Sequence, residues 1–279
     1  MSERSRGPLG WLRRLLGRGG VVVPVVRLHG VIAADTRPGR LNIAGVAPLL
    51  ERAFAIKSAP VVAIVINSPG GSPVQSRLIS KRIRDLADEN NKRVLVFVED
   101  AAASGGYFIA VAGDEIIADP SSIVGSIGVI AATFGFVQAI EKLGITRRVY
   151  TAGKNKSTLD PFLPEKLEDI ERIKAFELDV HATFIEAVKK RRGDRLKGGD
   201  ELFSGEWWAA TRGLDLGLVD AIGDLHQTLR DRYGKTVQLK LIAPKRPLFS
   251  LPRFGLSAGV VGDVAATIED RALWARYGL

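Results

Sequence analysis

Two kinds of segment alternate along residues 21–228. Short runs of Val, Ile and other apolar residues predict buried strands, and longer stretches with apolar residues at helical spacing predict amphipathic helices. The predicted strands are 21–28, 61–66, 93–98, 115–118, 127–131 and 147–150. The predicted helices are 41–56, 75–90, 103–111, 136–143, 165–192 and 205–211. Strands that alternate with helices in this way indicate an α/β fold with a mainly parallel sheet.

The domain organisation follows from the same pattern. No linker-like interruption divides residues 21–228, so we expect a single domain there. Residues 1–20 are predicted to be a basic N-terminal tail, and residues 229–279 a basic C-terminal extension. Within that extension, 244–257 contains Pro and is predicted to be extended, whereas 263–277 is predicted to be helical.

The formal net charge of +9 is concentrated near the two ends of the chain. Residues 1–20 hold five Arg against one Glu, and residues 230–253 hold seven basic residues against one Asp, so the remainder is close to neutral. A nucleic-acid-binding domain usually spreads basic residues along a groove with aromatic residues between them, and we therefore expect no nucleic-acid partner. The basic ends are instead candidates for peripheral contact with an anionic membrane.

The apolar segments are too short for membrane insertion. A membrane-spanning helix needs about 20 predominantly apolar residues, and no such stretch occurs. The apolar run at 21–26 is also too short for the core of a signal peptide. We therefore expect a cytoplasmic protein, with peripheral attachment to the inner face of the membrane as an option.

Several kinds of chemistry are excluded by composition. The chain has no Cys, which removes disulfides, thiol nucleophiles and Cys-ligated metals. Its three histidines, His29, His181 and His226, have no catalytic or metal-binding motif around them and are interpreted as structural or surface residues. We therefore expect neither a metal nor another cofactor.

Two glycine-containing turns follow predicted strands. The first holds the sequence NSPGG at 67–71, in which Gly70 and Gly71 can present free N–H groups to a developing oxyanion. A simple tight turn explains this sequence equally well. In the second turn, Ser104 precedes Gly105 at the start of a predicted helix. Ser104 is there either a helix N-cap or a nucleophile favoured by the positive end of the helix dipole.

A serine nucleophile needs a base, and a lysine in a dry pocket can supply one. At the reference pKa of Lys, only about one side chain in a few thousand is neutral at pH 7, so burial must disfavour the charged form. Lys154 and Lys156 lie just after a predicted strand, in a stretch without carboxylates between Glu141 and Asp160. Residue patterns alone do not choose between these lysines and others.

The combination of these motifs resembles the signal peptide peptidase A family of serine peptidases. The similarity covers roughly residues 21–225, and it is carried by segments 25–32, 67–71, 103–107, 125–129, 153–157 and 217–223. The resemblance implies a Clp-protease/crotonase-like spiral of repeated strand-strand-helix units. It also implies an endopeptidase that cleaves hydrophobic peptides, such as signal-peptide remnants or membrane-protein fragments, through an acyl-enzyme.

Site roles are also implied by the resemblance. Ser104 matches the nucleophile of the family, and Lys156 matches the general base, with Lys154 as the competing candidate. Gly71 and Gly105 match residues that offer oxyanion N–H groups. Ser126 either orients the lysine or is an ordinary turn residue.

The chain departs from the family pattern because it lacks the N-terminal membrane anchor that many members have. It is also a single short unit, so we expect a homo-oligomer, a ring or dome, in which neighbouring subunits can complete the site. Two other functions stay open. A crotonase-type acyl-CoA enzyme would share the fold but leaves Ser104 and Lys156 without a role. A non-catalytic scaffold would use the basic ends to bind membrane.

Overall fold

The computed structural model describes residues 20–37, 39–244 and 260–279. Its centre is a sheet in which successive neighbours follow the order β10-β1-β4-β5-β6-β9, and all of these pairs are parallel. The strands are β1 (Val22–His29), β4 (Val61–Ser68), β5 (Arg93–Ala103), β6 (Glu115–Ala118), β9 (Ala221–Ile222) and β10 (Gln238–Leu241). The predicted α/β class with a mainly parallel sheet is thus confirmed.

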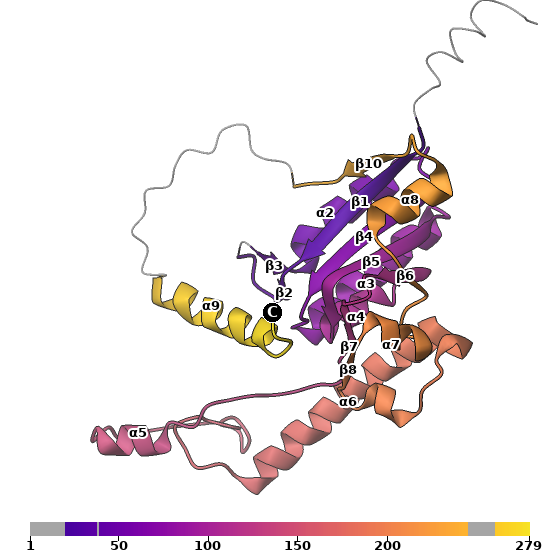
Figure 1. Cartoon of the computed structure of the whole chain (residues 1–279). Coiled ribbons are helices and arrows are strands. Elements are labelled where there is room, and N and C mark those ends of the chain that lie inside the picture. Colours follow the sequence, from indigo (N-terminus) through magenta and orange to yellow (C-terminus); the bar gives the residue numbers. More distant parts are fainter. Residues whose placement is uncertain (1–19, 38, 245–259) are drawn as a thin grey trace, which may run out of the picture.

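Both faces of this sheet are covered, which explains the long apolar runs in its central strands. All eight residues of β4 are buried. One face packs against α2 (Ile43–Phe54) and α3 (Pro73–Glu89), and the opposite face packs against α8 (Leu225–Tyr233) (Figure 1). Successive side chains of a strand point to opposite faces, so a strand covered on both sides has a continuous apolar run in place of an alternating pattern.

A second group of short elements lies at the carboxyl ends of the central strands. The strand β7 (Ile123–Gly125) pairs with the last residues of β5, and β8 (Trp207–Ala209) pairs antiparallel with β7. The remaining elements are β2 (Val31–Ile32), β3 (Arg40–Leu41), α4 (Gly105–Ala110), α6 (Leu167–Arg192), η1 (Gly193–Arg195), η2 (Asp200–Phe203) and α7 (Ala210–Asp215). The segment predicted as a helix at 205–211 therefore begins as a strand, because 207–209 find hydrogen-bond partners in β7.

Residues 129–166, here called the arm, leave the body of the fold and return to α6. Figure 1 shows the arm extending away from the sheet and carrying the short helix α5 (Val137–Lys142). The strands predicted at 127–131 and 147–150 are absent, because neither segment pairs with another strand. Most residues of the arm are exposed.

The domain does not end at residue 228, where the sequence predicted the start of a C-terminal extension. The helix α8 runs across the predicted boundary at residue 228, and β10 hydrogen-bonds to β1 at the edge of the sheet. Residues 229–242 thus belong to the body of the fold. The N-terminal tail, except for Gly20, and most of the stretch 244–257 lie outside the described residues.

The last helix, α9 (Val260–Ala275), lies beside the carboxyl ends of the central strands (Figure 1). It overlaps the terminal helix predicted at 263–277. Of the helices that the structure describes, none combines the length and the hydropathy needed to cross a membrane.

A buried ion pair fixes the end of α6 to the sheet. Both Arg192 terminal nitrogens donate to the Asp220 carboxylate, at 2.7 and 3.0 Å, and the Arg192 side chain is 1% exposed. Burial alone would raise the pKa of Asp220. The hydrogen bonds from Arg192 and from the Ile116 N–H outweigh burial, so the pKa of Asp220 lies below its usual value.

Candidate active site

Ser104 occupies the sharp turn between β5 and α4. Its backbone has φ 50° and ψ −120°, a conformation that costs a non-glycine residue free energy and that recurs at functional sites. The Ser104 N–H donates to the Gly125 carbonyl at 2.9 Å, and the Ser104 carbonyl accepts from the Phe108 N–H. The side chain makes no capping hydrogen bond to α4, so the hydroxyl is not used as an N-cap.

Two backbone N–H groups lie close to Ser104. The Ile32 N–H donates to the Gly70 carbonyl, and the Ser72 N–H donates to the Ile32 carbonyl, which holds the glycine turn against β2. Gly71 lies between these bonds, and its own N–H has no acceptor within the described part of the chain. Gly105 is the first residue of α4, where helix N–H groups have no intrahelical acceptor.

Close approach explains why the turn needs glycine. A Cβ on Gly70 would lie 2.8 Å from the Ser104 Cβ and 2.9 Å from the Gly105 nitrogen. Gly71 also has φ +137°, which side-chain-bearing residues rarely adopt. The two glycine turns found in the sequence therefore pack against each other, and the Gly71 nitrogen lies 3.4 Å from the position that a Cβ on Gly105 would take.

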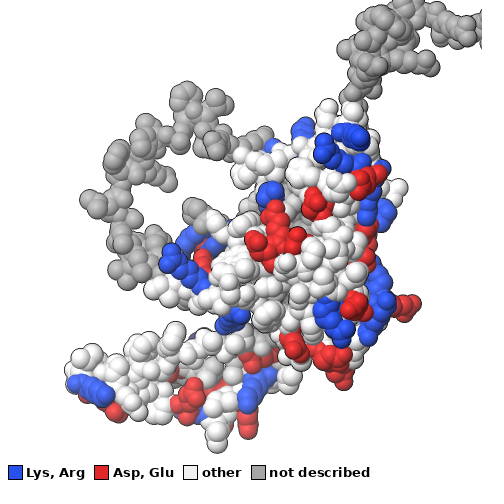
Figure 2. Space-filling view, in the orientation of Figure 1, with Lys and Arg blue, Asp and Glu red and all other residues white. Residues whose placement is uncertain are grey.

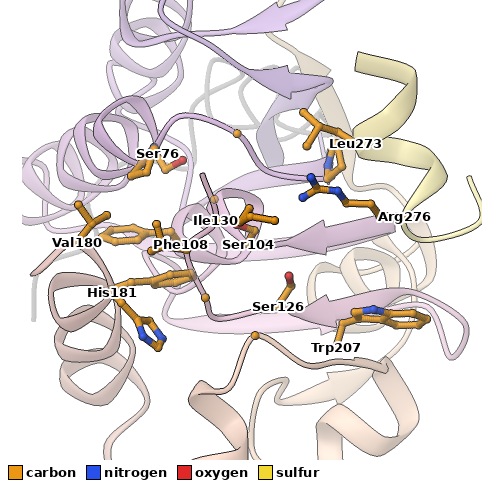
Figure 3. Close-up of a pocket in the computed structure, with 18 of the residues that line it drawn as sticks. Ser76, Ser104, Phe108, Ser126, Ile130, Val180, His181, Trp207, Leu273 and Arg276 are labelled. Atoms are coloured by element: carbon orange, nitrogen blue, oxygen red, sulfur yellow. The ribbon is translucent and has the colours of Figure 1, made fainter. Parts of the chain in front are cut away.

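A cavity of about 880 Å³ opens beside Ser104. One side is apolar, and the rings of Phe108 and Phe184 stand 4.9 Å apart in it (Figure 3). Arg77 and Arg276 are the charged residues among the described ones that line the cavity, and none of those residues is acidic. The described lining is therefore apolar on one side and carries no negatively charged residue.

Ser126 lies at the end of β7, on the opposite side of the cavity from Phe108 (Figure 3). It has φ 54°, and its N–H donates to the Glu206 carbonyl at 2.7 Å. The Ser126 hydroxyl oxygen accepts a hydrogen bond from the Tyr277 hydroxyl at 3.1 Å. Ser126 is therefore part of the Ser104 cavity and is already engaged by the C-terminal end of the chain.

Lys156 is in a different place. It lies in a turn of the arm, where its N–H donates to the Gly153 carbonyl, and it lines a shallow depression together with Arg147 and Asp160. It is not among the described residues that line the Ser104 cavity. The single chain thus brings together Ser104, the two glycine turns and Ser126, and leaves Lys156 outside that group.

Several lining residues were not identified from the sequence. His181, interpreted above as structural or surface, lines the cavity, and its Nε2 lies 3.0 Å from the Ile127 carbonyl oxygen. Leu273, Arg276 and Tyr277 reach the cavity from the far end of the chain. Only the apolar spacing of α6 could have pointed to His181, and no local signal connects residues 273–277 with Ser104.

The family model described as "Peptidase family S49" matches residues 87–239, more than half of the chain. A Brucella abortus (strain 2308) protein named Na(+)/H(+) antiporter NhaA is 58% identical over 92% of this chain and 37% of its own length. The chloroplastic serine protease SPPA of Arabidopsis thaliana is 29% identical over 93% of this chain and 40% of its own length. Protease 4 of Haemophilus influenzae is 31% identical over 74% of this chain and 34% of its own length.

This chain spans less than half the length of each of these three relatives, and the antiporter name describes a much longer protein. Among solved structures, a mutant of the 1510-N membrane-bound stomatin-specific protease matches 81% of this chain at 16% identity, with a TM-score of 0.43. The resemblance inferred from the sequence motifs is confirmed by the family match and by the protease relatives. The chain belongs to peptidase family S49.

Proposed function

We propose that the chain is a serine endopeptidase with Ser104 as its nucleophile and Lys156 as its general base, acting on peptides with apolar side chains. The observation that carries this proposal is the strained Ser104 turn, whose hydroxyl makes no capping bond, beside the Gly71 and Gly105 N–H groups. Ordinary turns do not need this backbone conformation, and neighbouring N–H groups beside the nucleophile are what a tetrahedral oxyanion requires.

The reaction proceeds in two halves. Neutral Lys156 removes the proton from Ser104 as Oγ attacks the peptide carbonyl carbon, and the N–H groups of Gly71 and Gly105 stabilise the oxyanion. A donor of this kind contributes about 3 kcal/mol to transition-state stabilisation. The C–N bond then breaks, the Lys156 ammonium protonates the leaving amine, and an acyl-enzyme remains. Water, deprotonated by Lys156, attacks the ester, and the proton returns to Ser104 as the acid product leaves.

The electrostatics of the cavity favour a neutral amine base. The described lining residues include two arginines and no carboxylate, so an ammonium there would gain no ion pair and would be repelled by like charges. The apolar side that contains Phe108 and Phe184 lowers the local water content further. A lysine that enters this cavity is therefore suited to accept a proton from Ser104.

We further propose that Lys156 is supplied by a second copy of this chain. Lys156 lies on the arm, away from the cavity of its own chain, and the arm exposes much apolar surface. Its exposed large apolar residues are Ile130, Phe134, Phe136, Leu143, Ile145, Val149 and Tyr150. Figure 2 shows charges on the arm only in small groups separated by broad uncharged areas. Apolar surface of this extent is typical of an interface between subunits.

Mixing two inactive variants tests the dyad and its origin together. Ser104→Ala and Lys156→Ala are each expected to lose peptide cleavage, and a mixture dissociated and reassembled is expected to recover activity, because some cavities receive both intact residues. Lys154→Ala, which removes the neighbouring lysine of the same turn, is the matched control and keeps activity. Normal cleavage by Ser104→Ala or Lys156→Ala alone contradicts the dyad. Two inactive parents whose mixture stays inactive contradict the exchange between copies.

A further inference from the structure

The C-terminal end of the chain closes one side of the Ser104 cavity. Leu273 in the last turn of α9, with Arg276 and Tyr277 just beyond it, contributes to the cavity wall. Figure 3 shows Leu273 and Arg276 entering from the α9 side, opposite Phe108 and His181. Within segment 267–279, these three residues therefore contact the same space that a substrate has to enter.

An ion pair anchors this segment to the body of the fold. Arg40 in β3 donates to both carboxylate oxygens of Asp270 in α9, at 2.8 and 3.3 Å. The Arg40 side chain is 10% exposed, so its guanidinium is largely shielded from water, whereas the Asp270 side chain is 32% exposed. Arg40 also donates to Asp35, which fixes its guanidinium in position for Asp270. A shielded, two-point contact of this kind stabilises docking more than a surface ion pair does.

Aromatic ring contacts hold the rest of the segment against the body of the fold. Trp274 lies with its ring centre 6.3 Å from that of His29, and Tyr277 meets Trp207 edge-on at 5.8 Å. Both aromatic side chains also pack against a small apolar cluster of Ala101, Ala103 and Ile123, which are residues of β5 and β7. Ala103 directly precedes Ser104, so the segment docks next to the turn that carries the candidate nucleophile.

The last contact of the segment is a hydrogen bond that the Tyr277 hydroxyl donates to Ser126 Oγ. We take Ser126 to orient the amine of Lys156, the first of the two roles that the family resemblance leaves open. We infer that segment 267–279 is a built-in inhibitor, which holds the position beside Ser126 until Lys156 on the arm of a second copy displaces it. This inference rests on the proposed function, because it needs Lys156 to come to Ser126.

The chain length between β10 and α9 permits this exchange. The 15 residues from 245 to 259 would span up to about 50 Å if fully extended. The segment can therefore leave the cavity while β10 remains in the sheet. As part of the same chain, it also returns at a high effective concentration, which keeps an isolated copy latent.

The test uses the full-length chain and two readouts. In a Ser104→Ala background, hydrogen exchange of residues 267–279 reports docking without any need for catalysis. In the Ser104 protein, the rate of labelling by a peptidyl phosphonate reports access to the nucleophile. Asp270→Asn weakens the Arg40 contact, Asp270→Glu keeps the charge, and Tyr277→Phe removes only the bond to Ser126. Arg271→Ala changes an exposed neighbour in α9 and is the matched control.

We expect Asp270→Asn to speed exchange in 267–279 and to raise the labelling rate about tenfold, as a loss of about 1.4 kcal/mol of docking free energy predicts. Asp270→Glu should fall near the wild type, Tyr277→Phe should raise labelling less than Asp270→Asn, and Arg271→Ala should change neither readout. Unchanged exchange in Asp270→Asn overturns docking. Faster exchange with unchanged or slower labelling overturns inhibition, since the segment would then be a needed wall of the cavity.

The same experiment separates the two proposals. An absence of labelling in the wild type and in every variant refutes Ser104 as the nucleophile, and with it both the proposed function and the inhibitor. Labelling that is normal but insensitive to Asp270→Asn refutes only the inhibitor and leaves the peptidase proposal standing.

Discussion

Ser104 and Gly125 are joined by a hydrogen bond of 2.9 Å from the Ser104 N–H to the Gly125 carbonyl. This bond ties the turn that carries the candidate nucleophile to the last residue of β7, directly before Ser126. Gly125 has φ +99°, and a Cβ at this position would lie 2.9 Å from two ring carbons of Trp208. The two sides of the cavity are therefore held together at a position that accepts only glycine.

Gly125→Ala should accordingly damage the site more than the fold. We expect a loss of about 2 kcal/mol in the free energy of unfolding from backbone strain, together with a reduction of at least about tenfold in phosphonate labelling. Gly135→Ala is the control, because that glycine has open space around its Cβ position. Urea unfolding and labelling rates measure the two effects. Labelling at the wild-type rate would show that the Ser104 turn does not depend on Gly125.

Asp220→Asn should destabilise the whole domain. It leaves the guanidinium of Arg192 buried without its carboxylate, and breaking a buried pair in this way costs about 3–5 kcal/mol. The control is Asp215→Asn, whose partner Arg212 lies 3.6 Å away at an exposed position, so that its loss should cost less than about 1 kcal/mol. Chemical denaturation of the three proteins at neutral pH compares them. Equal stability of both variants would contradict the structural role of the Asp220 pair.

The Asp220 carboxylate also makes the free energy of unfolding depend on pH. The pKa of Asp220 is lower in the folded chain than its usual 3.8, so the unfolded chain binds the proton more tightly. The contribution of this group is fully present above about pH 4 and is lost as pH falls through the folded-state pKa. We expect the free energy of unfolding to decline more steeply below pH 4 in the wild type than in Asp220→Asn. Parallel declines in urea titrations between pH 5 and pH 2.5 would contradict this.

The sequence was sufficient to predict the parts of the fold that depend on local pattern. The bounds predicted for the strand β4 and the helix α3 lie within two residues of those observed, and β5 begins where predicted but continues five residues further. Burial leaves a clear apolar pattern in these elements. The strands β7 and β8 are three residues long and exist only through their pairing with each other and with β5. Such short segments carry too few positions for a periodic signal.

The candidate site, like the fold, was predictable only where local sequence pattern defines it. Ser104 and Gly71 each follow a strong strand, so the turns that hold them could be found, and parallel strands bring those turns to one edge of the sheet. The wall formed by 273–277 depends on contacts such as Arg40 with Asp270, which are separated by 230 positions in the chain. No local pattern encodes a pair so distant, and the position of Lys156 on the arm is likewise set by long-range geometry.

Ile130 should influence which peptides are cleaved. It lines the same cavity as Ser104 and is 65% exposed, so it can be changed without disturbing the core (Figure 3). Ile130→Ala removes apolar contact area, and we expect kcat/KM for a peptide with Leu at the contacted position to fall about tenfold. The matched peptide with Ala should change little, which serves as the control. A similar decrease for both peptides would indicate a role other than side-chain contact.

The arm should be needed for assembly and for turnover, and less so for folding. Phe134 and Tyr150 are 80% and 90% exposed, so replacing both with Ser removes apolar surface that makes few contacts within the chain. We expect Phe134→Ser with Tyr150→Ser to change the free energy of unfolding by less than about 1 kcal/mol. Light scattering should show a smaller assembly, and peptide cleavage should fall because Lys156 no longer reaches a neighbouring cavity. Lys142→Ser, a polar change on the same arm, is the control. A variant that remains fully assembled and active would place the interface elsewhere, and a variant that is dissociated but fully active would show that one chain completes its own site.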